Sequence, residues 1–116
     1  MSVKIYHNPR CSKSRETLKL LEDRGIQAEI IEYLKSPPTA AELQAILIKL
    51  GMQPRELMRT KESEYKDNIL DDPALSDGEL IEAMVRFPKL IERPIVFNSD
   101  KAAIGRPPEN VLAILS

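Results

Sequence analysis

Near the N-terminus, the hydrophobic and polar positions change from a strand pattern to a helical pattern and back. Residues 3–7 alternate and stop at an Asn-Pro pair, which predicts a short strand and a turn. Residues 11–25 place leucines on one face and end in Gly25, a residue common just after a helix. Because the β-branched run at 28–34 predicts another strand, we expect a βαβ unit with two parallel strands.

Two helices in the middle of the chain are predicted from the residues at their starts. Thr39 and Glu42 have the spacing of a capping box, and the apolar stripe behind them predicts a helix that stops at Gly51. Ser76 and Glu79 repeat this spacing before a second amphipathic stretch, which runs to a proline. Both helices should therefore begin at these fixed positions.

The stretch between these two helices carries weaker signals. Pro54 suits the first turn of a short helix that would carry Leu57, Met58 and Arg59. Residues 60–68 are polar, and we expect a loop or a frayed helix there.

The C-terminal part is expected to add two strands and a helix. Residues 94–97 and 102–104 are short apolar runs joined by a turn at 98–101. Prolines at the start of residues 107–115 favour the first turn of a helix. The predicted order is β-α-β, helices, β-β and α, which indicates an α/β fold.

Length and composition favour a single domain, residues 1–116, with its own core. Of the 116 residues, 42% are hydrophobic and 30% are charged, which excludes a disordered chain. Lys and Arg number 17 and Asp and Glu number 18, so the net charge of −1 gives no general attraction to nucleic acid or to an anionic membrane. We therefore expect no nucleic-acid or membrane partner.

The single cysteine limits the compartment and the chemistry. It cannot form a disulfide within the chain. The first residues become polar too soon for the apolar core of a signal peptide, and no apolar run approaches the roughly 20 residues of a membrane span. We therefore expect a soluble, cytoplasmic protein in which Cys11 is a free thiol, and the chain is taken to act as a monomer. One cysteine and one histidine cannot build a typical zinc cage, so no metal site is expected.

The segment "HNPRCSKS" at 7–14 holds both the only histidine and the only cysteine. Cys11 falls at the first turn of the predicted helix, where unpaired N–H groups and the helix dipole favour a negative charge. Arg10, Lys13 and Arg15 add cations nearby, so we predict a thiol with a lowered pKa, which is a nucleophile. A lone cysteine is more often a small buried hydrophobic residue, but a polar and basic loop does not suit burial.

His7 and Ser14 flank this cysteine. His7 either bonds to the backbone at the strand end or tunes the charge of the thiol. Ser14 stands where a C-x-x-C pair would have its second sulfur, so no dithiol cycle is possible within the chain. An oxidised or adducted Cys11 must then be regenerated by an external thiol such as glutathione or a glutaredoxin.

Three arginines lie in suggestive short segments of the chain: Arg59, Arg93 and Arg106. A helix N-terminus that ionises a thiol also attracts an oxyanion, and a guanidinium can hold such an anion with two parallel hydrogen bonds. Taken singly, each arginine suits a solvated surface position. Beside a reactive thiol, they are candidate oxyanion ligands.

Four segments, "IYHNPRCSKSRETL", "LMRTK", "LIERPIVF" and "IGRPPENVL", resemble the glutaredoxin-dependent arsenate reductase family in order and spacing, over essentially the whole chain. The resemblance implies a thioredoxin-like fold with a central mixed four-stranded sheet and an inserted helical segment. The chain is similar to the shorter, chromosomal branch of the family, because the plasmid-borne arsenic-resistance enzymes continue past the last helix.

By this resemblance, Cys11 is the nucleophile that forms a covalent arsenic adduct with arsenate, and His7 influences its thiolate. The family's oxyanion-binding arginines correspond to Arg59, Arg93 and Arg106. Glutathione, as co-substrate, would convert the adduct into a mixed disulfide and arsenite, and glutaredoxin would then release the thiol. No tightly bound cofactor is implied.

Pro94 corresponds to the proline before the third strand of such folds. This proline is usually cis, so the Arg93-Pro94 bond is expected to be cis and next to the sulfur. Ser14 and Pro94 are therefore expected to support the site.

Two other functions stay open at this point. A glutathione-linked thiol reductase would use the same thiol on another oxyanion or on a mixed disulfide. A non-catalytic, thioredoxin-like transcriptional regulator would bind RNA polymerase, but such regulators typically carry a C-x-x-C switch, which Ser14 removes.

Overall fold

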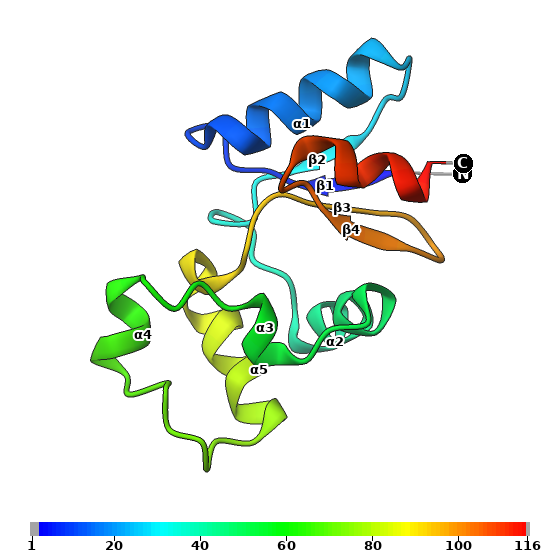
Figure 1. Cartoon of the computed structure of the whole chain (residues 1–116). Coiled ribbons are helices and arrows are strands. Elements are labelled where there is room, and N and C mark those ends of the chain that lie inside the picture. Colours follow the sequence, from blue (N-terminus) through cyan, green and yellow to red (C-terminus); the bar gives the residue numbers. More distant parts are fainter. Residues whose placement is uncertain (1–2, 116) are drawn as a thin grey trace. The chain divides into compact units, whose positions relative to one another are not determined.

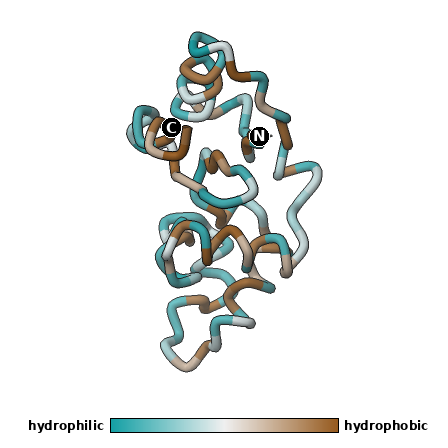
Figure 2. Tube along the Cα trace, turned by 90° about the vertical axis from the view of Figure 1, so that its right-hand side faces the viewer, coloured by the Kyte–Doolittle hydropathy of each residue, from teal (hydrophilic) through white to brown (hydrophobic). Residues whose placement is uncertain are grey.

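The computed structural model describes residues 3–115, which form two compact units. The first, the sheet unit, combines the chain up to Ser36 with the chain from Arg93 onward, and the second, the helical unit, is residues 37–92. Figure 1 shows the strands in the first unit and a group of helices in the second. Hydrophobic positions occur along the trace of both units (Figure 2). That the whole chain is one domain stays a prediction.

Four short strands form the mixed sheet that was expected. They are β1 (Lys4–Tyr6), β2 (Glu29–Ile31), β3 (Ile95–Phe97) and β4 (Ala102–Ile104), in the order β2-β1-β3-β4. β1 is parallel to β2, with Ile5 opposite Ile30, whereas β3 is antiparallel to both β1 and β4. The predicted βαβ unit and the α/β class are thus confirmed.

Two helical segments cover one face of this sheet, and they lie side by side in Figure 1. They are α1 (Ser12–Asp23), which connects β1 to β2, and η2 (Pro108–Ile114), which follows β4. The buried residues that join them to the sheet are Ile5, Leu21, Val96, Val111 and Ile114.

The expected C-terminal helix is a 3-10 helix. Its buried residues, Pro108, Val111 and Ile114, recur at every third position. This spacing matches the three residues per turn of a 3-10 helix, which places all three side chains on one face.

The helical unit contains α2 (Ala40–Leu50), α3 (Pro54–Leu57), α4 (Ser63–Asp67), α5 (Asp77–Arg86) and the short 3-10 helix η1 (Pro88–Leu90). Both predicted capping boxes are present. The Thr39 hydroxyl accepts a hydrogen bond from the Glu42 N–H at 3.1 Å, and the Glu42 carboxylate accepts from the Thr39 N–H at 3.0 Å. Ser76 and Glu79 make the same pair of bonds at the start of α5.

The helix expected to carry Leu57, Met58 and Arg59 ends earlier than predicted. Met58 instead forms an antiparallel bridge with Ile91, and the Arg59 N–H donates to the Leu90 carbonyl at 2.7 Å. Met58 and Ile91 are both buried, so extended pairing between these segments replaces a further helical turn. The polar stretch at 60–68, expected as a loop or frayed helix, contains the short α4.

No helix within residues 3–115 combines the length and the apolar character needed to cross a membrane.

Candidate functional site

The topology of the sheet brings four connections to one edge. Because β1 and β2 are parallel, both end at this edge, and the antiparallel β3 begins there. β4 is antiparallel to β3, so it also ends there. The loop before α1, the segment after β2, the residues before β3 and the residues after β4 therefore gather at the same edge.

Cys11 is the N-cap residue of α1. Its backbone is extended, with φ −97° and ψ 123°, and its side chain makes no capping bond. A turn holds it in place, because the Cys11 N–H donates to the Asn8 carbonyl and the Arg10 N–H donates to the Asn8 side chain, both at 3.0 Å. No acidic residue lies in the first turn of α1, so the N–H groups and the dipole of this helix end face the sulfur without a carboxylate of their own.

The thiol is more enclosed than its polar sequence suggested. Cys11 is only 8% exposed, so the expectation that this loop does not suit burial was wrong. The Nη2 of Arg106 lies 3.8 Å from the sulfur, brought there from a position 95 residues further along the chain. Such a contact cannot be read from the neighbours of Cys11 in the sequence.

Opposing influences act on the pKa of the Cys11 thiol. Burial raises the pKa, whereas the backbone N–H of Ser14, the side chain of Arg93 and the backbone N–H of Lys13 lower it. The pKa lies below its ordinary value as a result, which is the direction that the sequence predicted. The sequence argument credited the charge of Lys13, but this residue acts through its backbone.

Arg93, Pro94 and Arg106 form a connected group at the ends of β3 and β4. The Nε of Arg106 donates to the Arg93 carbonyl at 2.8 Å, and the Gly105 N–H donates to the Pro94 carbonyl at 2.9 Å. The Arg93-Pro94 bond is cis, as expected. The Arg106-Pro107 bond is also cis, which was not predicted.

His7 and Ser14 are joined by a buried contact. The Nδ1 of His7 lies 2.6 Å from the Ser14 hydroxyl oxygen, which also accepts the Asn8 N–H at 3.0 Å. Burial lowers the pKa of His7, Glu32 raises it and Arg15 lowers it, and the net result is a lowered pKa that favours a neutral ring at neutral pH. The His7 backbone N–H donates to the Ile31 carbonyl at 2.9 Å, so the residue also has the anchoring role that was considered for it.

Arg59 belongs to the helical unit. Its guanidinium forms an ion pair with Glu62, and its Nε lies 3.9 Å from a carboxylate oxygen of Glu92. The role of Arg59 toward an anion at Cys11 stays a prediction.

Two residues that the sequence argument missed shape the site. Gly105 has no side chain, and a Cβ there would lie 2.5 Å from the Thr17 hydroxyl and 2.9 Å from the Cγ of Pro94. Thr17 is fully buried and donates its hydroxyl proton to the Lys13 carbonyl at 2.8 Å. Glycine at 105 therefore lets the end of β4 approach both α1 and the cis-proline.

Resident metal ions have no evident site in the described part of the chain. Within residues 3–115, no group of three or more His, Cys, Asp and Glu residues could hold a metal ion. The chemistry that the site offers is that of a thiol of lowered pKa near the guanidinium groups of Arg93 and Arg106.

Comparisons with known proteins agree on one family. The model of the ArsC family matches residues 6–114. The uncharacterized protein YfgD of Escherichia coli is 59% identical over 114 residues, which cover 97% of this chain and 96% of that protein. The arsenate reductase of Haemophilus influenzae is 58% identical over 116 residues, which cover 99% of this chain and 100% of that protein.

A solved structure is similarly close. The arsenate reductase from Vibrio cholerae has a TM-score of 0.95 at 54% identity, and the match covers 98% of both chains. This likeness confirms the expected thioredoxin-like fold. With a family model that spans residues 6–114 and relatives above 50% identity over nearly the full length, this chain belongs to the ArsC family.

Proposed function

We propose that this chain reduces arsenate to arsenite at Cys11, with electrons from glutathione and with glutaredoxin as its partner. The observation that carries the proposal is a thiol of lowered pKa at a helix start that lacks a carboxylate, 3.8 Å from the Arg106 guanidinium. A relative that is 58% identical over its whole length carries the name arsenate reductase, which supports this substrate.

The first step is binding and attack. Arsenate is a tetrahedral oxyanion, so its oxygens can accept hydrogen bonds from Arg93, Arg106 and the N–H groups at the start of α1. The Cys11 thiolate attacks arsenic(V). A sulfur–arsenic bond forms, and an arsenate oxygen leaves as water after taking up protons.

The second step transfers the electrons. The sulfur of glutathione attacks the Cys11 sulfur, so that a disulfide forms while the sulfur–arsenic bond breaks. The electron pair of that bond stays on arsenic, which leaves as arsenite, in the arsenic(III) state. The two sulfur atoms have together supplied two electrons.

The third step restores the enzyme. The thiolate of glutaredoxin attacks the glutathione sulfur of the mixed disulfide, takes over the glutathione and releases the Cys11 thiolate. An outside thiol is required because Cys11 is the only cysteine in the chain. This count supports dependence on glutathione and glutaredoxin independently of the family resemblance.

Arg59 is proposed as a third oxyanion ligand, on the resemblance of "LMRTK" to the family's segment. Its pairing with Glu62 and Glu92 would orient its guanidinium. An arriving anion would then share the arginine's N–H donors with these carboxylates.

The test is arsenite formation from arsenate with glutathione and glutaredoxin present. We expect turnover that depends on all three components and that is absent in the folded Cys11→Ser variant. A folded parent protein without turnover above background would overturn the proposal. Reduction of a glutathione mixed disulfide in the same preparation would then indicate the alternative, a thiol reductase with another substrate.

A further inference from the structure

We propose that a cavity beside the Cys11 loop binds the small thiol that regenerates Cys11, and that it recognises this thiol by two carboxylates and an ammonium group. The inference rests on the proposed function, in which a γ-glutamyl thiol of the glutathione class takes part. The cavity has a volume of about 390 Å³ and is lined by residues 7–10 together with Glu32, Leu34 and Lys35. All of these residues belong to the sheet unit.

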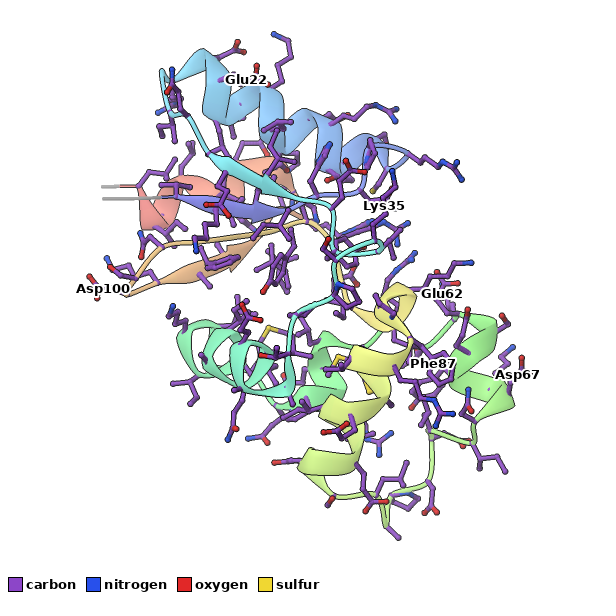
Figure 3. The ribbon with its side chains drawn as sticks, turned by 180° about the vertical axis from the view of Figure 1, so that it is seen from behind. Glu22, Lys35, Glu62, Asp67, Phe87 and Asp100 are labelled. Carbon is purple, nitrogen blue, oxygen red and sulfur yellow. The ribbon has the colours of Figure 1, made fainter. Side chains whose placement is uncertain are left out.

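The cavity lies where the chain segments after β1 and β2 separate. The His7 N–H donates to the Ile31 carbonyl at 2.9 Å, which joins the two strands at their carboxyl ends. Beyond this bond, one segment turns into α1, and the other folds back, with the N–H groups of Lys35 and Ser36 both donating to the Glu32 carbonyl at 2.9 Å. Lys35 is labelled in Figure 3, on the segment after β2. Hydrogen bonds thus fix both walls, and the volume is that of a small-molecule site.

The charges that line the cavity are the reverse of those on glutathione. Arg10 and Lys35 supply two cations and Glu32 supplies one carboxylate, whereas glutathione carries two carboxylates and one ammonium group. The Nζ of Lys35 and a carboxylate oxygen of Glu32 are 3.6 Å apart, and both side chains are well exposed. This separation is longer than a hydrogen bond, so a ligand can replace the pair with its own charges at little cost.

The same charges disfavour a free oxyanion in this cavity. The carboxylate of Glu32 repels a small anion, and no carboxylate occupies the equivalent place in the first turn of α1 beside Cys11. A zwitterionic thiol can place its ammonium group at Glu32 and its carboxylates at Arg10 and Lys35. The half-exposed Leu34 adds an apolar surface for the methylene groups of the ligand.

The cavity adjoins Cys11 along the chain. Arg10 lines the cavity and is bonded directly to Cys11, so their Cα atoms are about 3.8 Å apart. An extended tripeptide spans roughly 10 Å, and in the proposed complex its charged ends lie in the cavity while its central cysteine is directed toward Cys11. His7 lines the cavity too, and its ring is held by the 2.6 Å contact between its Nδ1 and the Ser14 hydroxyl oxygen.

The experiment is a titration of the full-length protein with S-methylglutathione, which keeps the charged groups but cannot form a disulfide. We expect saturable binding, with amide NMR shifts concentrated at residues 7–10 and 32–35. The Lys35→Glu variant should bind about tenfold more weakly, because it exchanges an attraction for a repulsion. The matched control is Lys19→Glu, at an exposed ion pair on α1 whose Nζ–carboxylate distance to Asp23 is 3.2 Å, and it should leave binding unchanged.

The titration overturns the inference if the ligand does not bind, if the shifts lie elsewhere, or if both variants lose affinity equally. A second measurement uses the glutaredoxin-coupled assay, in which Lys35→Glu should raise the KM for glutathione and leave the KM for arsenate unchanged. Equal KM values for glutathione in the parent and this variant would contradict the inference. A parent protein that does not reduce arsenate would overturn the proposed function, whereas the titration would still decide what the cavity binds.

Discussion

The starts of α1 and α2 differ in how they satisfy their N–H groups. In the helical unit, α2 begins with Thr39 and Glu42, which bond to each other's backbone and bring a carboxylate to the helix end. In the sheet unit, α1 begins with Cys11, whose side chain makes no capping bond and is followed by no acidic residue in the first turn. A helix whose first N–H groups are capped by its own side chains gains stability. A helix without such a cap can use these N–H groups to bind an anion or to stabilise a thiolate.

The net charges of the two units follow the same pattern as their helix starts: the helical unit is negative and the sheet unit is positive. The sheet unit has ten Lys and Arg against seven Asp and Glu, whereas the helical unit has seven against eleven. The unit that carries Cys11 is thus the one with a positive balance. An overall net charge of −1 conceals this difference, which favours an anionic substrate at the sheet unit.

The largest effect is expected from replacing the N-cap residue of α1 and that of α5, which has the same capping box as α2. Cys11→Ser should abolish arsenite formation while the protein stays folded, because serine is a good N-cap but the chain has no other thiol. Ser76→Ala, at the start of α5, should lower the free energy of unfolding by about 1 kcal/mol and leave turnover intact. Enzyme assays and denaturant unfolding on both variants measure this, and residual turnover in Cys11→Ser would contradict it.

Replacing Arg93 of the sheet unit and Arg59 of the helical unit should have different effects on Cys11 and on arsenate. Arg93→Ala should raise the pKa of Cys11 and lower kcat/KM for arsenate at least tenfold, because the guanidinium favours both the thiolate and the bound anion. Since the thiolate is the reactive form, alkylation of Cys11 would then begin at a higher pH than in the parent. Arg59→Ala should raise the KM for arsenate and leave the pKa of the thiol unchanged.

The readout for both arginine variants is the ultraviolet absorbance of the thiolate as a function of pH, which is unambiguous with one cysteine. Folding should survive, since a partly exposed ion pair such as Arg59–Glu62 contributes about 1 kcal/mol or less. An unchanged Cys11 pKa in Arg93→Ala would show that another group ionises the thiol.

Two glycines offer a matched test of packing. Gly105→Ala should cost about 1–3 kcal/mol in the free energy of unfolding, because the new methyl group would overlap Thr17 and Pro94. Gly78→Ala lies in α5, where the nearest atom would be the Ser76 hydroxyl oxygen at 3.9 Å, and should gain about 0.5–1 kcal/mol. Denaturant titrations measure the free energy of unfolding of both variants. Equal changes would refute the close approach of Gly105 to Thr17 and Pro94.

The smallest expected effect concerns the imidazole of His7. Glu32 raises the pKa of His7, so Glu32→Gln should lower it further, and only slightly because the carboxylate is partly exposed. Because the folded pKa is already depressed, stability is lost as the pH falls below the ordinary value of 6.5, and the variant should lose slightly more. NMR titration follows the only histidine directly, with Glu29→Gln as control, and a rise in its pKa would contradict the assignment.

The elements best predicted from the sequence are those whose signals are local. The capping boxes at Thr39 and Ser76 lie within three residues of their partners, and both are present in the structure. Cys11 at a helix start was read from a strand, a turn and an apolar stripe that follow one another directly. Such features need no knowledge of distant segments.

What the sequence could not reveal depends on distant residues that the fold brings together. Thr17 and Gly105 meet across 88 positions, and nothing near either residue marks the other. The bridge between Met58 and Ile91 overrides the local helix signal for the same reason. The burial of Cys11 and the action of Glu32 on His7 likewise arise only when the strands pair.

Residues 37–92 are inserted between β2 and β3. The end of β2 and the start of β3 both lie at the edge of the sheet that carries Cys11. Since β1 lies between them, these ends are two strand spacings, or about 10 Å, apart. About four extended residues bridge such a gap. A shortened chain could therefore keep every strand and the thiol, which makes this edge a natural place to graft a different segment.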